Sequence, residues 1–186
     1  MEIRIDVPAG KKAEWVNGVL TLVDETPKDD RPVTERVKTF EDAVRELGNE
    51  HPLVKEWRLG DGLSADLEAY LKLRIIAAAL NEGWKPKFTT DEYRYFPWFV
   101  LYTEEEHNNL SEEDKSRVVQ RSSFDSDAYS GAADVRAYSV SSNPYSYYGS
   151  RLAFKNSDLA RYAGKQFIEI YADFVFKPEC EESDNK

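Results

Sequence analysis

The sequence predicts a small α+β fold in which a small antiparallel sheet packs against two main helices and a β-hairpin forms the amino end. Two long segments, 64–82 and 157–174, carry apolar residues at helical spacing. Residues 2–7 instead alternate between apolar and polar side chains, as strands do. We expect the sheet to contain residues 98–102 and segments around 135–155. With 186 residues, of which 41% are hydrophobic, the chain can bury a core.

The amino-terminal segment is predicted to be β-structure. Alternation over residues 2–7 indicates a strand. The dipeptide Asn17-Gly18 lies between two apolar runs and accepts the positive φ angles of a tight turn, so it indicates a hairpin over 13–23. Residues 24–32 hold two prolines, four acidic residues and no apolar side chain, which is typical of a solvated connection. Any domain boundary is expected in this connection.

Two helices are predicted in the next part of the chain. Thr39 followed by Asp42 forms a capping-box pattern in front of a short apolar stripe that ends at Gly48. A longer helix follows Ser64, and its apolar residues cover most of the helix circumference. A helix that is apolar on nearly all sides is expected to lie at the centre of the core.

Residues 84–102 are the densest aromatic stretch of the chain. Because Pro97 cannot donate a ladder hydrogen bond, we expect a strand to start after it, over 98–102, and not to run through from 93. Capping patterns at Thr103 and Ser111 indicate one kinked or two short exposed helices that end near Val119.

The composition changes at residues 122–150, which hold nine Ser and five Tyr but no Leu, Ile or Lys. Such a stretch predicts a long loop or a polar hairpin, and long loops are often functional. Residues 152–154 are predicted to form a strand, and Asn156 or Ser157 to cap the final helix. We predict one domain over 1–176, with 1–32 as an accessory part, followed by a flexible acidic tail over 177–186.

The Ser/Tyr/Gly-rich stretch and segments 69–84, 92–99, 149–155 and 159–167 form a recognisable pattern over about residues 35–176. In this pattern the chain resembles an uncharacterised family of proteins from gut Bacteroidales and from the phages and prophages that infect them. The resemblance implies a phage-linked protein that is made in the bacterial cytoplasm and acts there or in a virion. No activity, cofactor or catalytic residue is implied.

The composition disfavours several classes of function. A net charge of -10 and a pI near 4.8 disfavour broad attraction to duplex nucleic acid. No apolar run is long enough for a membrane span, so no membrane partner is expected. The chain has a single Cys, Cys180 in the acidic tail, so no disulfide within the chain is expected. Its two histidines, His51 and His107, lie far apart in the sequence, and we expect His107 at the surface, so no metal site is predicted. Phosphate-binding glycine motifs and a nucleophile elbow around Ser150 are missing, so we expect no cofactor and no enzyme.

The first hypothesis is therefore a non-catalytic binding protein whose partner is a phage structural protein or a host factor. Tyr with Ser, Gly and Asn is typical of adaptable contact loops. The candidate contact residues are the tyrosines of the 122–150 stretch, Tyr129, Tyr138, Tyr145, Tyr147 and Tyr148. For the last two we favour packing against the 152–154 strand, whereas Tyr129 and Tyr138 fit either role.

The alternative hypothesis is a protein that binds single-stranded nucleic acid through stacking aromatic residues and a basic groove. Its candidate residues are Trp84, Lys85, Lys87, Tyr93, Arg94, Tyr95, Arg151 and Lys155. The acidic tail would occupy the groove when nucleic acid is absent. Trp84, Phe96, Trp98 and Phe99 are also expected as core residues, and the net charge favours a protein partner.

Overall fold

The computed structural model describes residues 6–16, 18–24, 29–87, 92–100, 102–116, 118–119, 136–140 and 150–175. The chain divides into two compact units, Met1–Pro32 and Val33–Lys186. The fold is α+β, as predicted: the described residues form helices and two antiparallel two-stranded sheets.

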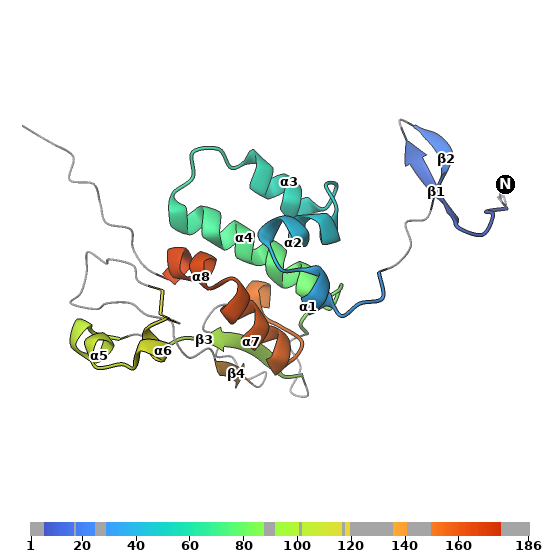
Figure 1. Ribbon diagram of the computed structural model, residues 1–186. Coiled ribbons are helices and arrows are strands. Elements are labelled where there is room, and N and C mark those ends of the chain that lie inside the picture. Colours follow the sequence, from blue (N-terminus) through green and yellow to red (C-terminus); the bar gives the residue numbers. More distant parts are fainter. Residues whose placement is uncertain are drawn as a thin grey trace, which may run out of the picture. The chain divides into compact units, whose positions relative to one another are not determined.

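The first unit is the predicted hairpin. Strand β1 (Lys11–Val16) pairs antiparallel with β2 (Val19–Asp24), and Val16 lies opposite Val19 (Figure 1). The loop therefore has two residues, and Gly18 adopts a φ angle of +80°, which glycine reaches without steric cost. The strand predicted over 2–7 is not observed at Asp6 and Val7, and its first residues lie outside the described part of the chain.

The second unit is built around one helix. Helices α1 (Val33–Arg36), α2 (Phe40–Leu47) and α3 (Pro52–Leu59) precede α4 (Ala65–Leu80). Helices α2, α3 and the carboxy-terminal α8 (Ile168–Val175) all pack against α4. The prediction of a central helix is confirmed, because four large side chains of α4 are at most 1% exposed: Leu73, Ile75, Ile76 and Leu80.

Local capping explains where the first helices begin. The Thr39 hydroxyl accepts a hydrogen bond from the Asp42 N–H at 3.1 Å, and the Asp42 carboxylate accepts one from the Thr39 N–H at 2.9 Å. These bonds confirm the predicted capping box of α2. Helix α3 was not predicted. It begins with Pro52 in the first turn, and Nδ1 of His51 accepts a hydrogen bond from the Leu53 N–H at 3.2 Å.

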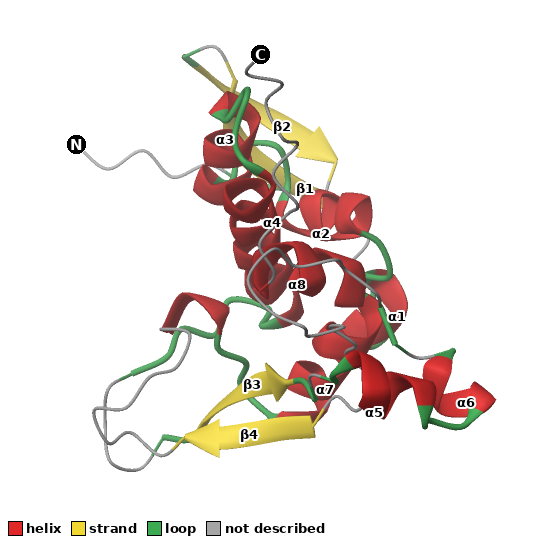
Figure 2. Ribbon diagram, turned by 90° about the vertical axis from the view of Figure 1, so that its left-hand side faces the viewer, coloured by secondary structure: helices red, strands yellow, loops and turns green. Residues whose placement is uncertain are grey.

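The second sheet corrects the predicted position of its first strand. Strand β3 (Arg94–Trp98) pairs antiparallel with β4 (Arg136–Val140), and helix α7 (Ser157–Gln166) packs against both (Figure 2). The strand thus runs through Pro97 and does not start after it, so the expectation of a strand over 98–102 was wrong.

The reason is the direction in which the backbone of Pro97 faces. The Tyr95 N–H donates to the Phe154 carbonyl at 3.1 Å, and the Phe154 N–H donates to the Tyr95 carbonyl at 2.9 Å. Tyr95 therefore turns its backbone groups away from β4. Pro97 lies two residues further and faces the same way, so its missing N–H removes no bond to β4.

The carboxy-terminal part differs from its prediction in two places. Residues 152–154 do not form a regular strand, because Ser150–Leu152 is a 3₁₀-helix, η1, and only Phe154 makes a β-bridge, to Tyr95. The final helix starts after the predicted cap Asn156 but is divided into α7 and α8 at Phe167. The Phe167 side chain is only 4% exposed, and neither proline nor glycine accounts for the break.

Helices α5 (Glu104–Asn108) and α6 (Glu112–Lys115) are the two short helices expected after Thr103 and Ser111. Thr103 and Glu106 form a capping box, and the Ser111 hydroxyl accepts a hydrogen bond from the Asp114 N–H at 3.1 Å. The expectation that His107 is exposed was wrong, since this residue is only 8% exposed. It lies near the end of α5, and the acidic residues before it in the sequence give no sign that its side chain is buried.

Candidate functional site

The first unit presents an apolar face to solvent. Trp15 lies opposite Leu20 and Ala13 opposite Leu22, so these four residues share one face of the hairpin. Trp15 is 73% exposed and Leu22 is 40% exposed. No residue described in this unit is buried. Among the residues described in this unit, none forms the covering layer that normally packs on the apolar side of a sheet.

The opposite face of the hairpin is mixed. Lys12 and Glu14 form an ion pair with a nitrogen–oxygen distance of 2.7 Å. Thr21 lies opposite Glu14 and donates its hydroxyl to the Val19 carbonyl at 3.3 Å. The hairpin is thus amphipathic. Lys11 and Asp24 pair at the end away from the loop, and the other charged residues of the two strands lie on the face opposite Trp15.

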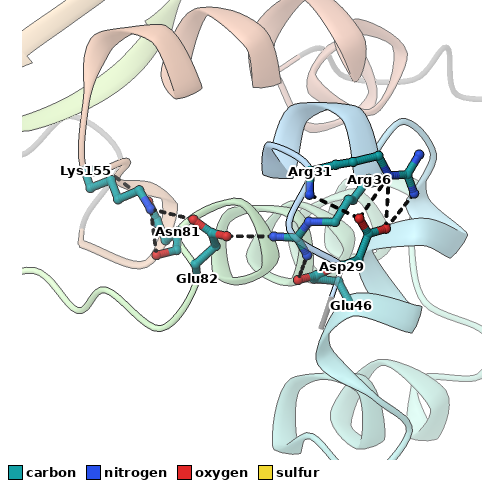
Figure 3. A network of polar contacts seen from close by, with 7 residues as sticks. All are labelled: Asp29, Arg31, Arg36, Glu46, Asn81, Glu82 and Lys155. Atoms are coloured by element: carbon teal, nitrogen blue, oxygen red, sulfur yellow. Dashed lines mark hydrogen bonds and ion pairs between the residues drawn. The ribbon is translucent and has the colours of Figure 1, made fainter. Parts of the chain in front are cut away.

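The second unit contains a polar network at the carboxyl end of α4 (Figure 3). Asn81 is 5% exposed, and its side chain donates to the Ala153 carbonyl at 2.7 Å and accepts from the Lys155 N–H at 3.0 Å. The amide thus bonds both a carbonyl and an N–H of one segment, as a neighbouring strand would. It holds residues 153–155 against the end of α4.

Glu82 extends this network with charges of opposite sign. Its carboxylate accepts hydrogen bonds from Nζ of Lys155 at 3.0 Å and from the Arg36 guanidinium at 2.7 Å, and Arg36 also pairs with Glu46. The hydrogen bond from Lys155, followed by the charges of Lys155 and Arg36, lowers the pKa of Glu82. A carboxylate with a lowered pKa that is held by two cations is a poor proton acceptor, so the arrangement suits a structural tie.

Asp29 and Arg31, also drawn in Figure 3, pair with each other in the first unit.

Four of the residues predicted for nucleic-acid binding are engaged within the fold. Arg94 is only 3% exposed, and Tyr95 packs against the main core. Lys155 belongs to the network around Glu82, and Trp84 packs against Phe96 and Ala153. Their aromatic rings and cations are therefore not all available to a nucleic-acid strand.

The other four residues of that prediction lie at the surface. Tyr93 is 56% exposed, and Lys85, Lys87 and Arg151 are exposed as well. The Lys87 N–H donates to the carboxylate of Glu92. Of the aromatic residues that were also expected in the core, Phe96 is buried and Phe99 half-buried, whereas Trp98 is 48% exposed.

The tyrosines predicted for partner binding fall largely outside the described residues. This applies to Tyr129, Tyr145, Tyr147 and Tyr148, and also to Cys180 and the acidic tail. Tyr138 lies in β4, where the register places it opposite Phe96.

Sequence reasoning found the hairpin but not its exposed face. The turn signal at Asn17-Gly18 identified the two strands, whereas the missing cover over Trp15 and Leu22 is a property of the folded chain. A signal was present in the sequence. The residues that share a face with Trp15 are apolar apart from the end pair, and the connection that follows has no apolar side chain to cover them.

Within the ranges given above, no group of three or more His, Cys, Asp or Glu side chains is placed to hold a metal ion. None of the helices described is both long enough and apolar enough to cross a membrane. A scan against protein-family models and searches of curated proteins and of solved structures found no match to this chain.

Proposed function

We propose that this chain is a non-catalytic, phage- or prophage-linked binding protein that acts through contacts with another protein. The observation that carries the proposal is the uncovered apolar face of the hairpin, on which Trp15 is 73% exposed. Exposed apolar patches on folded proteins commonly mark interaction sites, and Trp is enriched among the residues that dominate binding energy.

The distribution of exposed apolar side chains supports this assignment. Of the ten large apolar side chains exposed in the described part of the chain, five lie in the first unit: Val7, Trp15, Val16, Val19 and Leu22. This unit comprises only 32 residues. A partner with an apolar cleft would accept the Trp15 ring, and Leu20 and Leu22 would line the rim of the contact. The Tyr-rich stretch 122–150 would supply a second contact surface.

The partner class follows from the charge and from the placement of the basic residues. A net charge of -10, a buried Arg94 and an ion-paired Lys155 favour a protein partner over single-stranded nucleic acid. The resemblance to proteins of Bacteroidales phages and prophages supports a virion component or a host factor as the partner. A gene that lies beside capsid and tail genes would favour the virion, and one beside replication genes would favour the nucleic-acid alternative.

The proposal is tested by comparing two exposed tryptophans in a quantitative binding assay. Phage structural proteins and host proteins are captured on the immobilised full chain and identified by mass spectrometry. Trp15→Ala should reduce capture of the specific partner at least tenfold, about 1.4 kcal/mol, because a Trp at the centre of an interface typically contributes more than that. Trp98→Ala, which removes a 48% exposed ring from β3, is the matched control and should bind normally.

Replacement of Tyr129, Tyr145, Tyr147 and Tyr148 by Ser tests the second surface in the same assay and leaves β4, which pairs with β3, in place. Loss of the partner after this replacement, with Trp15→Ala unchanged, would assign the contact to the Tyr-rich stretch and not to the hairpin. Capture that neither change reduces would contradict the proposed function.

A further inference from the structure

The two strands of the hairpin differ in how they protect their outer edges. Strand β1 carries Lys11, Lys12 and Glu14, whereas β2 has neither charge nor proline between Val19 and Val23. In the part of the chain that the structure describes, no third strand pairs with either of them. Charged residues on an edge strand oppose pairing with a further strand, and a bare β-branched and aliphatic edge favours it. Only the β2 edge is therefore suited to accept another strand.

The first five residues of β2 form a palindrome. Residues 19–23 read Val-Leu-Thr-Leu-Val in both directions, with Thr21 at the centre. When two copies of this strand pair antiparallel with Thr21 opposite Thr21, Val19 lies opposite Val23 and Leu20 opposite Leu22. Every cross-strand pair then joins residues of the same type without a charge. This is the self-complementarity that a two-fold symmetric interface requires.

The backbone of β2 fits the same register. Val16 and Val19 flank the two-residue loop and so form a hydrogen-bonded pair, after which bonded and non-bonded pairs alternate along the hairpin. Val19, Thr21 and Val23 thus turn their N–H and C=O groups toward β1, and Leu20 and Leu22 turn theirs toward the free edge. In the palindromic register, Leu20 of each copy meets Leu22 of the other, so the outward groups of both residues bond one another.

We propose that two copies of this chain associate through β2 and form one four-stranded antiparallel sheet, in the order β1-β2-β2-β1. A second copy is the occupant because the bare edge is complementary to itself. The charged β1 strands then lie on the outside, which limits the assembly to a dimer. Association also stabilises the hairpin, since an isolated two-stranded sheet is only marginally stable in water.

This inference does not depend on the proposed function, because it uses the edge of β2 and not the face that carries Trp15. A two-fold axis perpendicular to the sheet keeps both apolar faces on the same side. The dimer would therefore join two copies of the Ala13, Trp15, Leu20 and Leu22 face into one continuous surface. A partner that binds this surface would meet two Trp15 side chains.

The oligomeric state of the full chain, measured by sedimentation velocity over a range of concentrations, tests the proposal. The wild-type chain should sediment as a dimer. Thr21→Lys should sediment as a monomer, because two like charges then lie opposite each other at the two-fold axis. In the monomer the new Lys lies opposite Glu14 of β1, which preserves the hairpin. Thr21→Val, which keeps the shape and adds no charge, should remain dimeric.

A charge exchange makes the test specific for this register. A Thr21→Lys chain and a Thr21→Glu chain that also carries Glu14→Lys, so that opposite charges still face each other within its hairpin, should each be monomeric alone. Their mixture should restore the dimer because opposite charges then meet at the axis. A wild-type chain that is monomeric at every concentration would overturn the proposal, as would a Thr21→Lys chain that stays dimeric. A chain that dimerises only after removal of residues 1–5 would also overturn it, and would assign the β2 edge to the chain's own amino terminus.

Discussion

The two units of this chain use the same kinds of apolar side chain in opposite ways. In the second unit, Leu73, Ile75 and Ile76 of α4 are at most 1% exposed, because helices α2, α3 and α8 cover them. In the first unit, Leu22 is 40% and Trp15 is 73% exposed, and no described residue is buried. Burial therefore stabilises the second unit, whereas the described apolar residues of the first unit remain exposed or half-buried. Under the proposed function, these exposed residues are the ones that contact the partner.

The largest effect should come from opening a cavity in the helical core. Leu73→Ala should lower the free energy of unfolding by about 2–5 kcal/mol, since the residue is almost fully buried and its neighbours relax only in part. Trp15→Ala, although it removes a larger side chain, should change it by less than about 0.5 kcal/mol, because the ring is mostly in water. Denaturant titration of both variants measures the difference. Equal losses for the two variants would refute the contrast between the units.

A smaller loss is expected when the buried amide that ties residues 153–155 to α4 is removed. Asn81→Ala would leave the buried Ala153 carbonyl without its partner, at a cost of about 1–3 kcal/mol, whereas water can reach the N–H of the half-buried Lys155. The measurement is again the free energy of unfolding. Asn109→Ala, at the exposed end of α5, is the control and should have little effect. A loss no larger than that of the control would show that water replaces both bonds.

The smallest effect is the pH dependence that Glu82 contributes. Because its pKa is lowered below the ordinary 4.5 in the folded chain, its stabilising contribution is complete above 4.5 and is lost as the pH falls through the lower folded-state value. Glu82→Gln should therefore be slightly less stable than the wild type at neutral pH, and the difference should vanish in acid. Glu82 is 43% exposed, so solvent screening keeps the effect small.

The control for this measurement is Glu41→Gln, at an exposed position on α2. Thermal or denaturant midpoints at neutral pH and in acid provide the comparison. A difference between Glu82→Gln and the wild type that persists unchanged in acid would show that Lys155 and Arg36 do not stabilise the charged form of Glu82.

Part of the fold could be predicted because its signals are local. The Asn17-Gly18 turn, the capping box of Thr39 and Asp42, and the paired caps before α5 and α6 act over four residues or fewer. Helix α4 was predicted as central for a similar reason, since only a helix covered on nearly all sides can carry apolar residues around its circumference.

The errors concern positions where the outcome depends on distant residues. Pro97 is accommodated in β3 because its backbone, like that of Tyr95, faces away from β4, and no local rule states which side of a strand will be paired. His107 is buried within an acidic helix, and Phe167 interrupts the last helix without a local breaker. For the candidate site, the sequence indicated the hairpin but not the exposure of Trp15.

By itself, the sequence determined the turn of the hairpin, the caps of α2, α5, α6 and α7 and the apolar periodicity of α4, because these signals act between neighbours in the chain. It also determined that residues 19–23 of β2 read the same in both directions, which depends only on the order of the residues in the chain. The tertiary structure decided which apolar residues are covered and which stay in water, as with Leu73 and Trp15. Burial depends on what packs against a side chain from elsewhere in the chain, and that information does not reside in any short stretch of residues.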